Sequence, residues 1–571
     1  MKIGVWLAAC LGLLLAACGG GGSVSASRPD PDVVGVDQFR KAAAGHRVLE
    51  SKVKGADGTP LATYVYLPKE GVGPFPVLVM RTPYDLPITP VSGFPEDHPN
   101  ARIEASPADV GWTEATDRGY ALVVQFVRGR YESDGLFSLF LDEVADGDAL
   151  IRWVEKQPWS NGKIGVFGDS ASGVVSLQAA AAGRASVRAV FAQATSPDFI
   201  GGVIFPEGRI KWEALLPFVL NQSTENSKDH DARLGLTPQR ILELQGEAGE
   251  ALVEMFGAVE EGDPSASSWW TRPITPDFPI VSQLQPRWGA LLAAGSTASS
   301  RAAQDVTDRI TAPTLHVSMW HDFFQESAFK SYGRMQAARG NQKLIVLDGT
   351  HYDIDDPDLW PSQPMFAWFD YWLKGSNNGV AGWPTVQYRV AGRPEAGLLT
   401  SATWPPAAAD LQTRPLAAPS KTLMIDPNRP APTLGGNHLT VSSGMEDQQP
   451  LLARADVVEL PGAPLDRKVL MTGSASATLR VLMSGGGDIV VKLVDRRPDG
   501  EVRLLRETVV SLGGAGSLTV NFSALAYEFD AGSAPGLLIA GASLPAYRSL
   551  TPPLSGQVQL GAAQLRLPVS P

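Results

Sequence analysis

Short apolar runs alternate with helical segments along the N-terminal half of the chain. Residues 75–80, 120–125 and 186–192 are strand-length runs of mainly apolar side chains, which is typical of strands that are buried on both faces of a parallel sheet. Residues 142–157 instead place their apolar side chains at helical spacing. Strands that alternate with helices in this way predict a doubly wound α/β sheet.

The α/β pattern is interrupted and then resumes. Between residues 201 and 311 the segments are helical, and 237–259 is the longest of them. Two further apolar runs follow at 314–320 and 343–347, separated by a helical segment at about 326–339. An insertion of this size between two strands of one sheet predicts a helical cap over the edge of that sheet.

The C-terminal part has a different pattern. Short alternating strands at 475–482 and 488–494, followed by a turn at 498–500, indicate an all-β sandwich of jelly-roll type. A chain of 571 residues is long enough for several such cores. The predicted domains are an α/β domain at 33–200 and 312–380, a helical cap at 201–311 and a jelly-roll sandwich at 381–571.

The N-terminus has the pattern of an export signal. Lys2 precedes an apolar run at 3–17 that is too short to span a bilayer comfortably. The run ends in Leu-Ala-Ala before Cys18, and glycines follow, which resembles a bacterial lipoprotein signal. We therefore expect a signal at 1–18, Cys18 as the lipidated first residue, and a flexible linker at 19–32. The protein would be exported and held by its lipid at a bacterial cell envelope membrane; a plain secretory signal is the alternative.

Composition narrows the possible functions. The formal net charge of −12 comes from scattered acidic residues, and the absence of a long basic run argues against nucleic acid as a partner. The two cysteines, Cys10 and Cys18, both lie in the signal. The folded part therefore offers no disulfide, no thiol nucleophile and no cysteine metal site, and we predict neither a metal nor another cofactor.

The most informative motif is Gly-Asp-Ser-Ala-Ser-Gly at 168–173, between a strand-like run and a helix rich in small residues. A tight turn of this kind is typical of a nucleophile elbow, in which Ser170 projects alone at the top of a sheet. The backbone N–H groups at the start of the helix would face developing negative charge. Gly173 lies one position later than the usual motif requires, and an ordinary turn with a capping serine is the alternative.

A serine nucleophile needs a base and an acid that orients the base. His351 follows the last apolar run of the α/β domain, and Asp322 ends the preceding run. Both positions suit an α/β-hydrolase, whose triad occurs in the order serine, acid, histidine. Asp348 and Asp353 are rivals for the acid, but they share the loop of His351. We therefore favour Ser170, Asp322 and His351.

The oxyanion of the transition state also needs hydrogen-bond donors. The backbone N–H of Ala171, directly after Ser170, is one candidate. The second donor should come from the loop after an early strand, which here is residues 81–85 (RTPYD) and contains no glycine run. The hydroxyl of Tyr84 is therefore the second candidate, although a loop tyrosine often only covers a core.

Several segments occur together in the order that is found in the cocaine esterase / Xaa-Pro dipeptidyl-peptidase family of α/β-hydrolases, which includes α-amino acid ester hydrolases. The chain resembles this family from about residue 48 to near the C-terminus. The matching segments are residues 81–85 (RTPYD), 128–135 (RGRYESDG), 157–165 (QPWSNGKIG), 168–173 (GDSASG), 320–327 (WHDFFQES) and 349–351 (GTH).

The resemblance implies roles for individual residues. It implies Ser170 as nucleophile, His351 as base, Asp322 as acid, and Tyr84 with the Ala171 N–H as oxyanion donors. The family's motif is G-x-S-Y-x-G, which accounts for the late glycine. This chain departs from the motif because Ala171 stands where the family has tyrosine. The backbone donor is kept and the ring is lost, so we expect a different acyl or leaving-group preference.

We predict a serine hydrolase that cleaves an ester or amide bond of a small-molecule acyl substrate through an acyl-enzyme. Phe324, Trp212 and Phe218 are the residues expected to form an apolar acyl pocket between sheet, cap and β domain. The first alternative is an Xaa-Pro dipeptidyl peptidase, which needs a carboxylate to bind the free amine of its substrate. The second is a non-catalytic binding protein built on the same scaffold.

Overall fold

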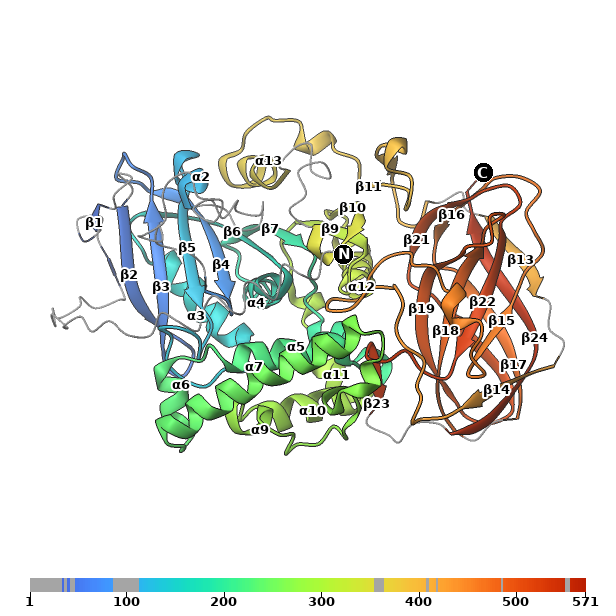
Figure 1. Ribbon diagram of the computed structural model, residues 1–571. Coiled ribbons are helices and arrows are strands. Elements are labelled where there is room, and N and C mark those ends of the chain that lie inside the picture. Colours follow the sequence, from blue (N-terminus) through green and yellow to red (C-terminus); the bar gives the residue numbers. More distant parts are fainter. Residues whose placement is uncertain are drawn as a thin grey trace, which may run out of the picture.

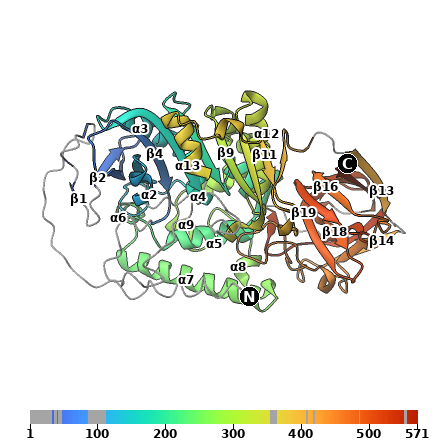
Figure 2. The same ribbon diagram turned by 90° about the horizontal axis from the view of Figure 1, so that it is seen from above.

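The computed structural model describes residues 33–34, 38, 40–41, 47–85, 112–353, 364–406, 410–416, 420–483, 486–549 and 555–570. The predicted lipoprotein signal, Cys18 and the linker lie outside these residues. No helix within them is both long and apolar enough to cross a membrane. Figures 1 and 2 show the α/β domain with the helical cap along one side and the C-terminal β domain at one end of the molecule.

The centre of the α/β domain is an 11-stranded mixed sheet with the order β1-β2-β3-β5-β4-β6-β7-β9-β10-β11-β12. The strands from β5 to β11 run parallel, while β1, β2, β3 and β12 pair antiparallel at the two edges. The strands are β1 (Arg40–Lys41), β2 (Arg47–Lys54), β3 (Pro60–Leu67), β4 (Phe75–Thr82), β5 (Ala121–Phe126), β6 (Ser160–Asp169), β7 (Val187–Gln193), β9 (Thr314–His321), β10 (Lys343–Thr350), β11 (Val386–Tyr388) and β12 (Leu399–Ser401).

Helices cover both faces of this sheet. Val77 and Val79 of β4 pack in one core and Leu78 and Met80 in another, since successive side chains of a strand point to opposite faces. Helices α3, α4 and α12 contribute to the first core and α2 and α13 to the second. Their bounds are α2 (Trp112–Asp117), α3 (Glu143–Glu155), α4 (Ser170–Ala180), α12 (Gln325–Arg339) and α13 (Pro364–Phe369). The α/β-hydrolase architecture predicted from the sequence is thus confirmed.

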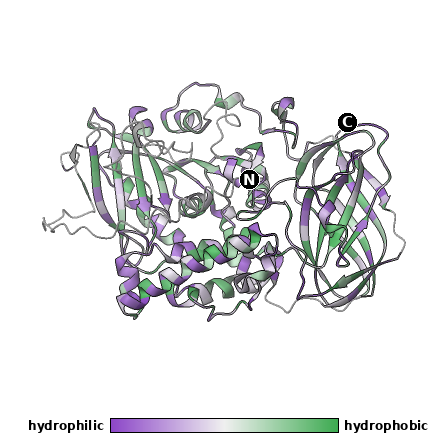
Figure 3. Ribbon diagram, in the orientation of Figure 1, coloured by the Kyte–Doolittle hydropathy of each residue, from purple (hydrophilic) through white to green (hydrophobic). Residues whose placement is uncertain are grey.

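The cap begins with a π-helix (Ile200–Ile204) and is helical as predicted, apart from the short strand β8 (Arg209–Lys211). Strand β8 pairs with β23 (Tyr547–Ser549) of the C-terminal domain, a link that the sequence did not predict. Figure 3 shows hydrophobic and hydrophilic residues alternating along the cap helices, as expected for helices with one buried face. The helices are α5 (Trp212–Ser223), α6 (Lys228–Arg233), α7 (Pro238–Glu260), α8 (Ser268–Thr271), α9 (Val281–Leu284), α10 (Trp288–Ser296) and α11 (Ala298–Gln304).

The C-terminal domain is an all-β sandwich. A seven-stranded sheet around β24 faces a four-stranded sheet of the order β15-β22-β18-β19, and apolar side chains of both sheets form one core. The strands are β13 (Asp410–Leu416), β14 (Lys421–Ile425), β15 (Val457–Leu460), β16 (Val469–Gly473), β17 (Ser476–Met483), β18 (Gly487–Arg496), β19 (Val502–Leu512), β20 (Gly516–Asn521), β21 (Leu525–Phe529), β22 (Ala534–Ala540) and β24 (Gly556–Val569).

One predicted boundary needs correction. The α/β domain was expected to end at residue 380, yet β11 and β12 lie beyond it and extend the main sheet. Strand β11 pairs parallel to β10, and β12 returns antiparallel to β11. Both strands are only three residues long, so their local sequence carries too few apolar positions to distinguish them from the β-rich segment that follows.

Candidate active site

Strand β6 turns into helix α4 at Ser170, which adopts a φ of 45° in the left-handed region that non-glycine residues rarely occupy. Close contacts at both glycines of the motif leave no room for a side chain. A Cβ on Gly168 would lie 2.8 Å from the backbone of Ser172, and a Cβ on Gly173 would lie 2.6 Å from the side chain of Thr195. Thr195 in turn donates a hydrogen bond from Oγ1 to the carbonyl of Ser170 at 2.8 Å. Gly173 therefore makes room for Thr195, whose hydrogen bond to the Ser170 carbonyl holds the turn.

The structure brings the predicted nucleophile, base and acid together. Ser170 Oγ lies 3.0 Å from His351 Nε2, and His351 Nδ1 lies 3.0 Å from Asp322 Oδ2. Asp322 is fully buried, and its other oxygen accepts the N–H of Phe324 at 2.7 Å. These side chains meet because β6, β9 and β10 are parallel strands of one sheet whose carboxyl ends lie at the same edge. Nδ1–H donates to the carboxylate, so the lone pair of Nε2 faces the serine hydroxyl.

The rival acids have other partners. Asp348 accepts the N–H of Gly392 at 2.8 Å, and Asp353 accepts the N–H of Thr350 at 2.7 Å. Within the described chain neither carboxylate has a hydrogen bond to His351. The geometry therefore favours Asp322 over both rivals.

The two histidines of β9, His316 and His321, are buried and neutral. Burial lowers the pKa of His316 to about 4 despite a hydrogen bond with Gln342. Burial, together with the charge of Arg506, lowers the pKa of His321 to about 3. His321 therefore packs beside Asp322 as an uncharged side chain.

A small cavity of about 30 Å³ opens at Ser170. Tyr84 and Ala171, the two predicted oxyanion donors, line it on the side of the α/β domain. Phe218 and Phe324, two of the predicted pocket residues, also line it. The remaining lining residues are Phe199, Ile204, Ala214, Leu215, Phe323 and Leu439, so every described residue of the lining is uncharged.

Trp212 does not line the cavity and requires a correction. Its ring is fully buried and packs at 5.4 Å from the ring of Phe278 and 6.4 Å from that of Trp288, inside the cap. An aromatic residue at the start of a cap helix has the same sequence signature whether it faces the substrate or the core of the cap. Only the rotation of α5 decides which of the two occurs.

Several residues of the cavity wall were not predicted from the sequence. Leu439 belongs to the C-terminal domain, and no local pattern marks it. Phe199 directly precedes the π-helix that begins the cap, and no motif in the sequence marks it. Phe323 lies in the segment 320–327, directly before the predicted Phe324, so the sequence did offer a signal for it. Its ring packs 4.9 Å from the ring of His351.

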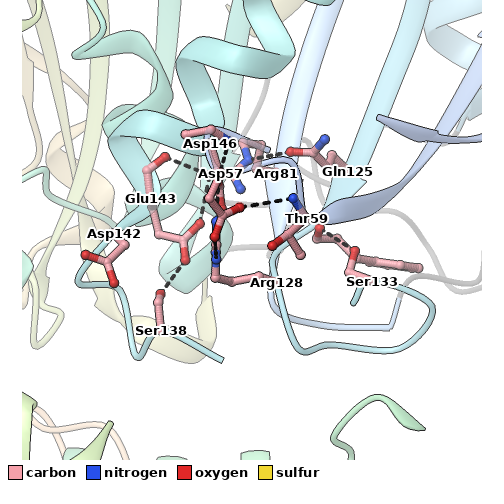
Figure 4. Close-up of polar contacts among 12 residues, drawn as sticks. Asp57, Thr59, Arg81, Gln125, Arg128, Ser133, Ser138, Asp142, Glu143 and Asp146 are labelled. Carbon is pink, nitrogen blue, oxygen red and sulfur yellow. Dashed lines mark hydrogen bonds and ion pairs between the residues drawn. The ribbon is translucent and has the colours of Figure 1, made fainter. Parts of the chain in front are cut away.

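A buried polar network anchors the strand that leads to the Tyr84 loop (Figure 4). The guanidinium of Arg81 donates to Gln125 at 2.9 Å and pairs with the carboxylate of Glu143 at 2.8 Å, and all three side chains are buried. Nearby, Arg128 lies between Asp57 and Asp146 and binds both carboxylates. Arg81 and Arg128 each have a carboxylate partner, and this pairing offsets the cost of taking the charges out of water.

A second buried charge cluster joins the cap to the C-terminal domain. His438 Nε2 lies 2.7 Å from Glu507, and Nδ1 lies 3.6 Å from Glu213 of α5. Burial acts to lower the pKa of His438, but the two carboxylates outweigh it and hold that pKa above its usual value. Glu213 also accepts the N–H groups of Leu439 and Thr440. The cluster therefore ties the Leu439 segment to the cap beside the cavity.

Comparisons with known proteins agree with this architecture. Residues 57–353 match the X-Pro dipeptidyl-peptidase (S15) family, and residues 378–565 match the C-terminal non-catalytic domain of X-Pro dipeptidyl-peptidases. The chain is 26% identical over 506 residues to a cocaine esterase from Rhodococcus sp. strain MB1 Bresler, covering 80% of this chain and 81% of that protein.

Two solved structures share the fold along almost the whole chain. An α-amino acid ester hydrolase has a TM-score of 0.69 at 17% identity, covering 98% of this chain and 100% of that one. An aminopeptidase from a marine sediment Thaumarchaeota archaeon has a TM-score of 0.68 at 17% identity, covering 97% of this chain and 99% of that one. At this level of identity the likeness concerns the fold.

Proposed function

The chain belongs to the X-Pro dipeptidyl-peptidase (S15) family and is a hydrolase of ester or amide bonds, and we propose that Ser170, His351 and Asp322 form its catalytic triad. The observation that carries this proposal is the continuous hydrogen-bonded line from Ser170 Oγ through the imidazole to the buried carboxylate, with 3.0 Å at both steps. Such a line is the arrangement by which a weak serine nucleophile is activated.

The reaction follows from these contacts. His351 Nε2 takes the proton of Ser170 as Oγ attacks the substrate carbonyl, and Asp322 stabilises the imidazolium that forms. The N–H of Ala171 and the hydroxyl of Tyr84 donate to the oxyanion of the tetrahedral intermediate. His351 then protonates the leaving alcohol or amine, which leaves an acyl-enzyme on Ser170. Water, activated by the same imidazole, attacks the acyl group and restores the serine.

We assign the cavity at Ser170 to the acyl group and propose that this group is small, apolar and uncharged. The described lining residues carry no charge. A charged acyl group would therefore lose its hydration there without gaining a partner of opposite charge, at a cost of about several kcal/mol or more. The peptidase alternative requires a carboxylate for the substrate's free amine. That requirement favours the esterase or acylase assignment over the dipeptidyl peptidase.

Two experiments test the proposal. Fluorophosphonate labelling should modify the wild-type protein and leave Ser170→Ala unlabelled; an unlabelled wild-type protein would instead support the non-catalytic alternative. Initial rates with p-nitrophenyl acetate, butyrate and benzoate should then exceed those with Gly-Pro and Ala-Pro p-nitroanilides. Cleavage of the anilides alone would overturn the choice of substrate.

We also propose that the protein is exported and lipidated on Cys18. This proposal is supported by the apolar run at 3–17, the small residues before the cysteine and the glycines after it. Cells that express the chain should incorporate labelled palmitate into it, and Cys18→Ala should abolish that labelling without changing the esterase rate. Equal labelling of both proteins would contradict lipidation at this position.

A further inference from the structure

We propose that Ser172 and Thr82 are positioning residues that fix the Tyr84 loop against the nucleophile elbow and so hold the tyrosine hydroxyl in place as an oxyanion donor. The inference rests on the proposed function of Ser170 and Tyr84 and adds to it the two side chains that join their segments. Ser172 lies two residues after the nucleophile on α4, and Thr82 is the last residue of β4, two residues before Tyr84.

The contact between the two segments is direct and buried. Ser172 Oγ donates to Thr82 Oγ1 at 2.9 Å, and both side chains are almost completely shielded from solvent. Thr82 Oγ1 also accepts the backbone N–H of Tyr84 at 3.0 Å and faces the carbonyl of Tyr84 at 3.4 Å. The helix that carries the nucleophile is thereby connected to the backbone of the oxyanion residue through one hydroxyl group.

The hydrogen-bonding capacity of that hydroxyl is fully used. A threonine hydroxyl offers one donor and two acceptor sites. Thr82 accepts from Ser172 and from the N–H of Tyr84, and its own hydrogen points to the Tyr84 carbonyl. This fixes the direction of every proton in the group, so the loop has one favoured position relative to the elbow.

Arg130 holds the same loop from its other side. Its guanidinium is fully buried, and Nε donates to the carbonyl of Pro83 at 3.0 Å. A second nitrogen of the same group donates to the carbonyl of Gln222 at the end of α5. The backbone of residues 82–84 is therefore held between the elbow helix and the cap, and Thr82 makes the contact with the elbow helix.

This arrangement matters because an oxyanion donor works only when it is placed before the charge develops. Removing one such donor lowers kcat by about 100- to 1000-fold, and a misplacement of about 1 Å can cost about 100-fold. The contribution of Ser172 and Thr82 should therefore appear in kcat through Tyr84, with little effect on substrate binding.

The chain offers a matched control on the same helix. Ser176 lies one helical turn after Ser172, is equally buried, and contacts the same strand one residue earlier. Its hydroxyl accepts the N–H of Arg81 at 3.0 Å and faces the Arg81 carbonyl at 3.3 Å. Ser176→Ala therefore removes a hydroxyl of the same kind from the same interface while leaving the hydrogen bonds among Ser172, Thr82 and Tyr84 in place.

The test is a double-mutant cycle with Tyr84→Phe on the full-length protein. Thr82→Val and Ser172→Ala should each lower kcat for p-nitrophenyl acetate by about tenfold, less than the loss expected for a missing donor or a misplacement of about 1 Å because the tyrosine is displaced only in part, while KM changes little. Thr82→Ser keeps the hydroxyl and should restore the rate. Ser176→Ala should keep kcat near that of the wild type. In the Tyr84→Phe background, Thr82→Val should have almost no further effect, since coupled residues are not additive.

The outcomes separate the two proposals. If Thr82→Val lowers kcat equally with and without the Tyr84 hydroxyl, the pair does not act through Tyr84 and the inference is overturned. The same conclusion follows if Ser176→Ala loses as much kcat as Ser172→Ala, because the effect would then be one of general packing. Absence of fluorophosphonate labelling in the wild-type protein would instead overturn the proposed function of Ser170. Near-ultraviolet circular dichroism of each variant shows whether it is folded.

Discussion

Replacement of Asp322 by asparagine is the sharpest test of the catalytic assignment, because the structure dictates how the new amide must lie. One carboxylate oxygen of Asp322 accepts the N–H of Phe324 at 2.7 Å, and the other faces His351 Nδ1 at 3.0 Å. In Asp322→Asn the amide oxygen must remain at the Phe324 N–H, since an NH₂ group there would oppose another donor. The NH₂ group then points at Nδ1 of the imidazole.

That orientation reverses the tautomer of the base. Nδ1 becomes the acceptor and the proton moves to Nε2, which then donates to Ser170 instead of accepting its proton. For a triad acid changed in this way, kcat falls by about 10⁴-fold, which corresponds to about 5 kcal/mol in the activation barrier. The side chain keeps its size and both of its hydrogen-bonded contacts, so we expect little change in folding.

The assay is the initial rate of p-nitrophenyl acetate hydrolysis, with active-site concentration determined from the burst of p-nitrophenol. Asp348→Asn is the matched control, because it applies the same change to a nearby carboxylate that accepts the N–H of Gly392 and does not contact His351. The control should retain most of the wild-type kcat. The acid has been misassigned if Asp322→Asn keeps more than about a tenth of the wild-type rate while Asp348→Asn loses most of its activity.

Three further changes test the pocket, the elbow and the domain contact. Ala171→Leu should fill the cavity and lower kcat/KM for the butyrate ester more than for the acetate ester; an unchanged ratio would remove the cavity from the acyl site. Gly173→Ala places a Cβ 2.6 Å from Thr195 and should lower the free energy of unfolding by about 1–3 kcal/mol, measured in urea; a fully stable, active variant would contradict the contact. His438 has a raised folded pKa, so its stabilising effect is present below the ordinary histidine pKa of about 6.5 and is lost as pH rises through the folded value. His438→Gln should therefore be less stable than the wild type by about 3–5 kcal/mol at pH 6, with a flatter profile from pH 6 to 9; parallel profiles would argue against the charged cluster.

The strands of the α/β sheet were predictable because a strand that is buried on both faces is a continuous run of mainly apolar residues. The apolar runs at 75–80, 186–192 and 343–347 match the strands β4, β7 and β10 to within one residue at their starts. The strands β11 and β12 escaped prediction because three residues are too few to show a period. They belong to the sheet through pairing with β10, which is a contact between distant parts of the chain.

The candidate site was predictable to the extent that each residue sits in its own local motif. Ser170, Asp322 and His351 each follow a recognisable strand, and the carboxyl ends of parallel strands meet at one edge. The burial of Trp212 within the cap could not be predicted, because α5 carries apolar residues around most of its circumference and its sequence does not reveal which side faces the substrate. Leu439 could not be found either, since it reaches the cavity from another domain.

The sequence by itself determined the strands, the elbow and the order of the predicted triad, because these depend on the chemistry of neighbouring residues. The tertiary structure decided which carboxylate meets His351, which side chains close the cavity, and how Thr82 and Ser172 join the two segments around Ser170. Those features depend on distances between residues that are far apart in the chain. Such distances are set by how helices and sheets pack together, and that packing leaves no periodic trace in the sequence.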